Sequence, residues 1–233
     1  MTTLEGAVVL VTGGSRGMGK AMVDDLLTRG VKKVYATARS PKPSTDDRVV
    51  NVPLEVTDPA SIEALAAAAP DVTVLINNAG VTGGSSLLES PVEEIRDVFE
   101  ANFFGPLNVI RAFVPIIERN GGGHVLNMHS VLSWITFGGA YPASKSAFWS
   151  LTNALRLDLL DRGIGVTGLH VGYVDTDMTA GITDPKSKPE DIAKQALDAI
   201  ETGAFEVVAD EISRNVKAGL SADLTAHYPQ LKG

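Results

Sequence analysis

The chain has 233 residues, 44% of them hydrophobic and 21% charged, which is typical of a soluble globular protein. Its formal net charge of −8 argues against a basic surface that follows nucleic-acid phosphates, so no nucleic-acid partner is expected. The absence of cysteine excludes disulfides, thiolate nucleophiles and thiolate metal sites, and we predict no bound metal.

The first stretch, MTTLEGAVVLVTGG, has neither the basic region nor the long apolar run of a secretory signal. No apolar run approaches the roughly 18 to 20 residues that a membrane-spanning helix needs. We therefore expect a cytoplasmic protein that does not contact a membrane.

Short β-branched runs alternate along the chain with longer segments that carry apolar residues at helical spacing. Several of the short runs are apolar at successive positions, as parallel strands covered on both faces are. The predicted strands are 7–12, 31–38, 48–54, 71–77, 124–130, 165–171 and 205–209, and the predicted helices include 17–30, 91–123 and 143–163. This order predicts an α/β fold: one domain, residues 1–233, with a doubly wound parallel sheet and helices on both faces.

A glycine-rich turn, TGGSRGMG at 12–19, connects the first predicted strand to the first predicted helix. Glycine permits positive φ and a close backbone approach, and the free N–H groups at a helix start favour a pyrophosphate. The turn therefore predicts a dinucleotide cradle, although a glycine turn without a ligand is the alternative. The candidate cradle residues are Gly13, Ser15, Arg16, Gly17, Met18 and Gly19.

The stretch GGSRG at 13–17 also matches the G-x-S-x-G elbow of serine hydrolases. Such an elbow needs an oxyanion donor from an earlier strand's loop, and only twelve residues precede the first glycine. Neither His170 nor His227 has the context of a triad base, so a hydrolase is a remote alternative.

The end of the second predicted strand reads YATARS and carries no carboxylate. An acidic residue at this position would bind the free 2′-hydroxyl of the adenosine ribose and exclude a 2′-phosphate. Arg39 can instead offer a guanidinium to the phosphate, and Arg16 could face the same side. The pattern predicts NADP(H), although an ordinary solvated arginine is the other interpretation of Arg39.

Tyr141 and Lys145 lie four positions apart in YPASK, so on a helix they share a face. A nearby ammonium favours the phenolate and lowers the pKa of a phenol from its usual value of about 10. A carbonyl that accepts a hydride needs a proton donor and a second hydrogen bond on its oxygen. Ser130, which ends a predicted strand, could give that second bond, and Ser133 is the competing choice.

Taken in chain order, TGGSRGMG, NNAG at 77–80, Asn102, Ser130 and YPASK resemble the short-chain dehydrogenase/reductase family over essentially the whole chain. The resemblance implies a Rossmann-type domain and NAD(P)(H)-dependent oxidoreduction between an alcohol and a carbonyl. It implies Tyr141 as the general acid or base, and Lys145 as the group that lowers its pKa and binds the nicotinamide ribose. It also implies that Ser130 polarises the carbonyl and that Asn102 holds a water in a proton relay.

The resemblance implies further cofactor contacts after the later strands. Thr176 would bind the carboxamide, and the other candidates are Glu55, Val56, Asn78, Ala79, Gly80 and Val174. The chain departs from the family pattern at Val171–Gly172, where PG is usual, and at Glu55, where an aspartate normally contacts the adenine. The segment 179–191 is shorter than the substrate lid of many relatives, which suggests an open pocket.

The remaining aromatic residues and histidines have less specific interpretations. Trp134, Ile135 and Phe137 either line an apolar substrate pocket or belong to the core or a subunit contact. His129 is expected to be structural, because neighbouring strand residues point to opposite faces. The helix 143–163 is apolar on more than one face, which suggests a homodimer or homotetramer.

The sequence as a whole predicts an NADP(H)-dependent carbonyl reductase or alcohol dehydrogenase that acts on an apolar ketone, aldehyde or secondary alcohol. A nucleotide-binding sensor of the same fold, without turnover, is the alternative.

Overall fold

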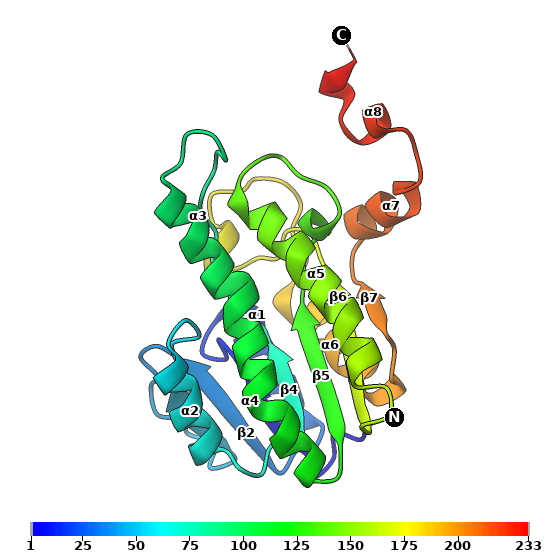
Figure 1. The fold of residues 1–233 in the computed structure, drawn as a ribbon. Helices are drawn as coiled ribbons and strands as arrows, with labels where there is room; N and C mark the ends of the chain where they lie inside the picture. Colours follow the sequence, from blue (N-terminus) through cyan, green and yellow to red (C-terminus); the bar gives the residue numbers. More distant parts are fainter. Residues whose placement is uncertain (1, 233) are drawn as a thin grey trace.

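The computed structural model describes residues 2–232, in which strands and helices alternate (Figure 1). The strands are β1 (Val8–Val11), β2 (Lys33–Ala38), β3 (Val49–Pro53), β4 (Val74–Asn77), β5 (Gly123–Met128), β6 (Ile164–His170) and β7 (Glu206–Val208). The α-helices are α1 (Gly17–Thr28), α2 (Pro59–Ala68), α3 (Val92–Phe99), α4 (Gly105–Arg119), α5 (Ala140–Asp158), α6 (Pro189–Thr202), α7 (Glu211–Gly219) and α8 (Leu224–His227). All of the predicted strands are confirmed, with small differences at their ends.

The strands form one parallel sheet in the order β3-β2-β1-β4-β5-β6-β7. The chain proceeds from β1 outward to β3 and then returns to place β4 on the other side of β1. This reversal between β1 and β4 is the point where open α/β sheets bind ligands, outside the carboxyl ends of the strands. The predicted doubly wound sheet is therefore confirmed.

Two apolar clusters cover the two faces of the sheet. Alternate residues of β1 enter opposite clusters. Val9 and Val11 pack on the face that α1 and α6 cover. Val8 and Leu10 pack on the face that α2 and α4 cover. Figure 1 shows α4 and α5 lying in front of the sheet. Burial on both faces explains why β1 and β4 are apolar at every or nearly every position instead of alternating.

The predicted helix 91–123 runs without a break from Val92 only to Arg119, because Gly123 already begins β5. Its centre also differs from a regular α-helix. Between α3 and α4, the segment Glu100–Phe104 is a π-helix. One wider turn of this kind changes the direction of the side chains within it, and such turns are frequent at functional sites. Asn102 lies in this segment and is buried.

The core position of Phe113 generates a stability prediction. Its side chain is fully buried in the cluster on the α4 face, so Phe113→Ala should lower the free energy of unfolding by about 3 to 5 kcal/mol, measured by urea denaturation. Leu88→Ala is the matched control, because Leu88 is 97% exposed and should change stability by less than about 0.5 kcal/mol. Equal stability of the two variants would contradict the assigned core.

Candidate active site

The candidate residues gather where the carboxyl ends of β1, β4 and β5 meet. The glycine turn follows β1, NNAG follows β4, and Ser130 follows β5, at the upper end of the sheet in Figure 1. The amino-terminal turn of α5 brings Tyr141 to the same end. Segments far apart in the sequence therefore form one site at the switch point of the sheet.

The glycine turn has the backbone shape of an anion cradle. Gly13 and Gly17 adopt φ values of +66° and +52°, which disfavour other residues. A Cβ on Gly19 would overlap the carbonyl oxygen of Gly13. The first turn of α1 contains no acidic residue, and its N-cap, Arg16, makes no side-chain capping bond. Its N–H groups and the positive end of the helix dipole remain available to a pyrophosphate.

NNAG is locked onto this turn by hydrogen bonds. The Asn78 side-chain amide donates to the carbonyl oxygens of Thr12 (2.9 Å) and Gly13 (3.2 Å). The Thr12 hydroxyl accepts the backbone N–H groups of Asn78 (2.9 Å) and Ala79 (3.0 Å). Sequence reasoning missed Thr12, although its place between the strand and the first glycine was a usable signal.

Asn102 ties the segment after β4 to α5. Its side-chain oxygen accepts the Val81 N–H at 2.9 Å, and its Nδ2 donates to Val81 O (2.9 Å) and to the Ser144 hydroxyl (3.1 Å). A Cβ on Gly80 would lie 3.1 Å from Asn102 Oδ1 and 3.8 Å from Lys145 Nζ. Asn102 therefore positions the backbone beside Lys145, while its water-holding role stays a prediction. Ser144 was missed because nothing in the local pattern separates it from other helical serines.

Burial raises the pKa of Tyr141 to about 12. The Ser130 side chain interacts with the phenol and lowers this pKa only in part. Lys145 Nζ lies 5.8 Å from the Tyr141 ring centroid and donates to Met128 O at 2.9 Å. Burial lowers the pKa of Lys145 to about 8. The expected lowering of the Tyr141 pKa is therefore wrong for this structure, because burial of the phenol dominates.

The two candidate serines have different partners. Ser130 Oγ accepts the Leu132 N–H at 3.1 Å, and the Ser130 side chain lowers the Tyr141 pKa. Ser133 Oγ turns back and accepts the Ser130 N–H at 3.3 Å, so it closes a capping box on the short helix Val131–Ser133. Of the pair, Ser130 is the serine whose side chain acts on the tyrosine.

The residues predicted to bind the adenosine end of the cofactor are less tightly grouped than the residues around Tyr141. Arg39 is exposed just after β2. Arg16 Nη1 lies 3.2 Å from Asp177 Oδ2, in an ion pair that sequence reasoning missed because 161 positions separate the two residues. Glu55 Oε1 accepts the Thr57 hydroxyl at 3.0 Å. The other candidates at this end are Ser15, which is exposed, Met18, which packs partly on the core, and Val56, whose carbonyl adjoins Gly105.

The segment after β6 reaches the glycine turn. Val174 is buried and forms an isolated bridge with Ser187, which closes the intervening loop. A Cβ on Gly17 would lie 3.2 Å from the Thr176 methyl group. Thr176 is therefore placed beside the cradle, as its predicted role requires.

Comparison with known proteins decides the family. A family model described as short chain dehydrogenase matches residues 7–187. The chain belongs to the short-chain dehydrogenase family. It is 34% identical to the 3-oxoacyl-[acyl-carrier-protein] reductase FabG of Vibrio cholerae over 195 residues, 78% of this chain and 79% of that protein. It is 32% identical to the 1-deoxy-11-beta-hydroxypentalenate dehydrogenase of Streptomyces exfoliatus, over 91% of this chain and 86% of that protein.

A solved structure extends the likeness to the whole of this short-chain dehydrogenase. The short chain dehydrogenase from Burkholderia cenocepacia in complex with NADP superposes with a TM-score of 0.92, at 34% identity, over 99% of both chains. The predicted family, the Rossmann-type fold and the oxidoreductase class of this enzyme are thereby confirmed. The hydrolase interpretation of the glycine turn is not favoured.

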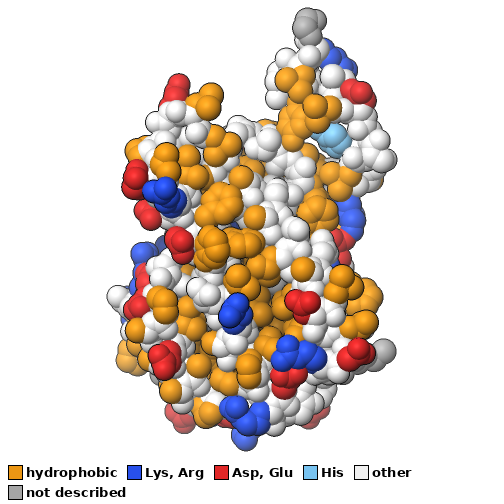
Figure 2. All heavy atoms as spheres, in the orientation of Figure 1, with side chains coloured by type: hydrophobic (Ala, Val, Ile, Leu, Met, Phe, Trp, Pro, Cys, Tyr) orange, Lys and Arg blue, Asp and Glu red, His pale blue; other side chains and the backbone are white. Residues whose placement is uncertain are grey.

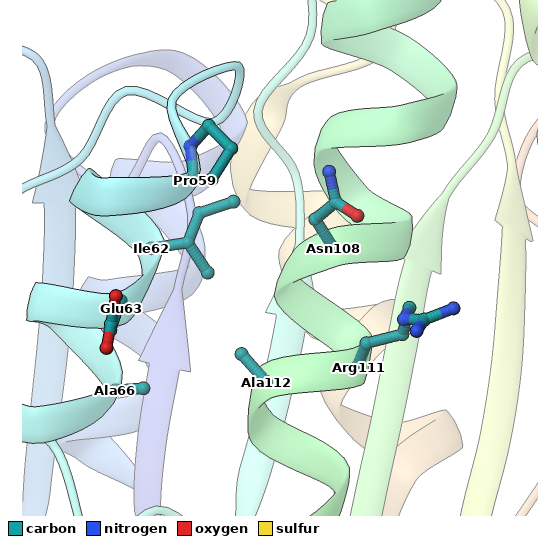
Figure 3. Close-up of a pocket in the computed structure, with 7 residues that line it drawn as sticks. All are labelled: Pro59, Ile62, Glu63, Ala66, Asn108, Arg111 and Ala112. Carbon is teal, nitrogen blue, oxygen red and sulfur yellow. The ribbon is translucent and has the colours of Figure 1, made fainter.

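A separate hollow of about 360 Å³ lies between α2 and α4 of the dehydrogenase (Figure 3). It contains none of the candidate site residues, so we exclude it from the active site. Its lining residues are Pro59, Ile62, Glu63, Ala66, Asn108, Arg111 and Ala112. Within residues 2–232 we find no cluster of three metal-ligating side chains, and no helix there has the length and apolarity to cross a bilayer.

The crowding at Gly19 gives a test of the cradle. Gly19→Ala would push the turn away from Gly13 O and Asn78 Nδ2, so NADPH affinity should fall about tenfold or more, which corresponds to 1.4 kcal/mol or more. Fluorescence titration with NADPH measures the change. Lys20→Ala is the neighbouring control, because Lys20 points away to Asp24, and it should bind NADPH normally. Unchanged affinity in Gly19→Ala would show that the turn does not hold the pyrophosphate.

Proposed function

We propose that this enzyme transfers a hydride between NADP(H) and an apolar ketone, aldehyde or secondary alcohol. The observation that carries the proposal is the grouping of Ser130, Tyr141 and Lys145 beside a glycine cradle at the switch point of the sheet. Family membership supports the same reaction class.

The chemistry of carbonyl reduction assigns a role to each of these groups. When bound, NADPH supplies the hydride to the carbonyl carbon. Tyr141 donates its phenolic proton to the oxygen that becomes the alcohol, and its raised pKa keeps that proton in place at neutral pH. Ser130 hydrogen-bonds the same oxygen and stabilises its developing charge. Lys145 contacts the nicotinamide ribose, and Asn102 holds the water that returns a proton to the site.

The dinucleotide fits the groups that the chain offers. The glycine turn at the start of α1 holds the pyrophosphate. Arg39 and Arg16 bind the 2′-phosphate. The pair between Arg16 and Asp177 is exposed on both sides, so it is weak enough for a phosphate to displace. The NADP complex of the Burkholderia relative supports this choice of cofactor.

The substrate class is inferred from the apolar side chains around the site. Phe137 lies in the loop before α5, and Met178 lies after β6; they are 76% and 54% exposed. The upper end of the molecule is hollowed and carries hydrophobic side chains on both rims (Figure 2). Trp134 does not contribute to this opening, because it stacks on His170 in the interior. An open, apolar entrance fits an apolar carbonyl compound.

The assembly and location of the enzyme are also proposals. Exposed apolar residues near the end of α5, Leu157 and Leu160, support packing against a second copy in a dimer or tetramer. We also place the enzyme in the cytoplasm, as the sequence predicts.

A turnover assay distinguishes the enzyme from a nucleotide-binding sensor. The wild type should oxidise NADPH with members of a panel of apolar ketones and aldehydes. Tyr141→Phe keeps the ring and should bind NADPH normally, but its turnover should fall by about 10²-fold or more because the proton donor is lost. Tyr35 lies in β2, and Tyr35→Phe removes a phenolic hydroxyl that bonds Asp71, so this variant should turn over normally. NADPH binding with no turnover on any carbonyl would favour the sensor.

The cofactor preference tests the role of Arg39. Each charge-assisted contact to phosphate contributes about 1.5 to 3 kcal/mol, so Arg39→Asp should weaken NADPH binding about ten- to a hundredfold and improve NADH use. The ratio of kcat/KM for the two cofactors is the measurement. Arg111→Asp makes the same charge change in the hollow of Figure 3 and should leave the ratio unchanged. An unchanged ratio in Arg39→Asp would refute the assignment.

A further inference from the structure

A buried cluster of rings lies behind Ser130, and the proposed chemistry does not use it. His170, the last residue of β6, is fully buried. The Trp134 ring stacks on its imidazole, with centroids 3.9 Å apart and planes 14° apart. The His129 ring, just beyond the end of β5, lies 4.8 Å away, and the Phe148 ring lies 4.9 Å from His129. Packing of this kind fixes the imidazole in one orientation.

One imidazole nitrogen of His170 meets the backbone of Ser130. His170 Nδ1 lies 3.3 Å from the Ser130 carbonyl oxygen. A carbonyl oxygen can only accept a hydrogen bond, so Nδ1 carries the proton and donates it. The Ser130 oxygen also accepts the Ser133 N–H at 2.9 Å, which starts the short helix after β5. Two donors therefore hold this one peptide group.

The other nitrogen of His170 faces a charged pair. His170 Nε2 has no hydrogen-bond partner and lies 3.5 Å from Glu206 Oε1 of β7, and Glu206 is paired with Lys217 of α7. The remaining charged or titratable groups that face the ring are Lys145 and Arg156 of α5 and His129, which directly follows β5. Burial and these cations lower the pKa of His170 to about 3, so the ring is neutral near pH 7. With Lys217 neutralising Glu206, the unprotonated Nε2 is tolerated beside the carboxylate.

We propose that His170 is a positioning residue for the reaction: its Nδ1–H holds the Ser130 carbonyl, so that the Ser130 hydroxyl stays directed at the Tyr141 phenol and the substrate oxygen. Trp134 lies in the loop that Ser130 begins, and it locks the ring from one side. The Ser130 hydroxyl oxygen is attached to the Cβ, which is attached directly to the backbone. A rotation of the Ser130 backbone therefore turns the hydroxyl away from the substrate oxygen that reacts. The proposal rests on the proposed function, since it assumes that Ser130 acts on the substrate.

Kinetics of two substitutions test the donor. His170→Phe keeps a flat ring against Trp134 but removes the N–H, so kcat should fall about tenfold while the Kd for NADPH stays unchanged. His170→Asn retains an N–H in reach of the same carbonyl and should recover most of kcat. His124→Gln, at the opposite end of β5, is the control for losing a buried histidine and should keep wild-type kcat. Equal losses in His124→Gln and His170→Phe would overturn the proposal.

A double substitution separates positioning from general loosening. If His170 acts only through Ser130, then Ser130→Ala combined with His170→Phe should have the kcat of Ser130→Ala alone. Losses that multiply in the double variant would overturn the proposal. Because the wild type is measured in the same assay, an inactive wild type refutes the proposed function, whereas an active wild type with multiplying losses refutes only the role of His170.

A spectroscopic measurement tests the tautomer without relying on turnover. In the wild-type protein labelled with 15N-histidine, the NMR signals that disappear in His170→Asn should show a neutral ring with the proton on Nδ1 at pH 7. A proton on Nε2 would overturn the proposal even if catalysis is normal, because the Ser130 carbonyl would then have no donor from the ring.

Discussion

The hydrogen bonds that join the ends of β1 and β4 are the constraint on which the rest of the site depends. Thr12 and Asn78 exchange backbone and side-chain hydrogen bonds across the switch point of the sheet. The same bonds fix the glycine turn on one side and direct the chain past Gly80 toward Asn102 and Lys145 on the other. The cofactor cradle and the catalytic groups are therefore positioned by one shared clamp.

Burial determines the electrostatics of the site. It disfavours the charged forms, so it raises the pKa of Tyr141 and lowers the pKa of Lys145. A protonated phenol suits the donation of a proton to a reduced carbonyl oxygen. In the opposite direction, alcohol oxidation, the phenol must first lose its proton, and there the Ser130 side chain favours the phenolate.

The carboxyl-terminal part of the chain contributes to the site from outside the segment that the family model matches, residues 7–187. Glu206 and Lys217 lie behind His170, and the Tyr228 hydroxyl accepts the Thr136 N–H at 3.1 Å in the loop that precedes α5. Asp210 accepts the Gly172 N–H at 2.6 Å. These contacts hold the loops on both sides of Ser130 with residues that are far away in sequence.

Local pattern was enough to predict the strands, the glycine cradle and the Tyr141–Lys145 pair, because each depends on spacing within a few residues. Consecutive apolar residues indicated parallel strands, and a separation of four on one helix placed the tyrosine and the lysine together. Only the tertiary structure decided the features that depend on burial or on residues far apart in the sequence. It placed the Ser130 side chain, rather than that of Ser133, where it acts on Tyr141, and it paired Arg16 with Asp177. It also raised the Tyr141 pKa, which the lysine alone was expected to lower. The spacing of residues in the sequence does not reveal that a phenol is buried and desolvated, or that two residues 161 positions apart form an ion pair. Both features arise only when the chain is folded.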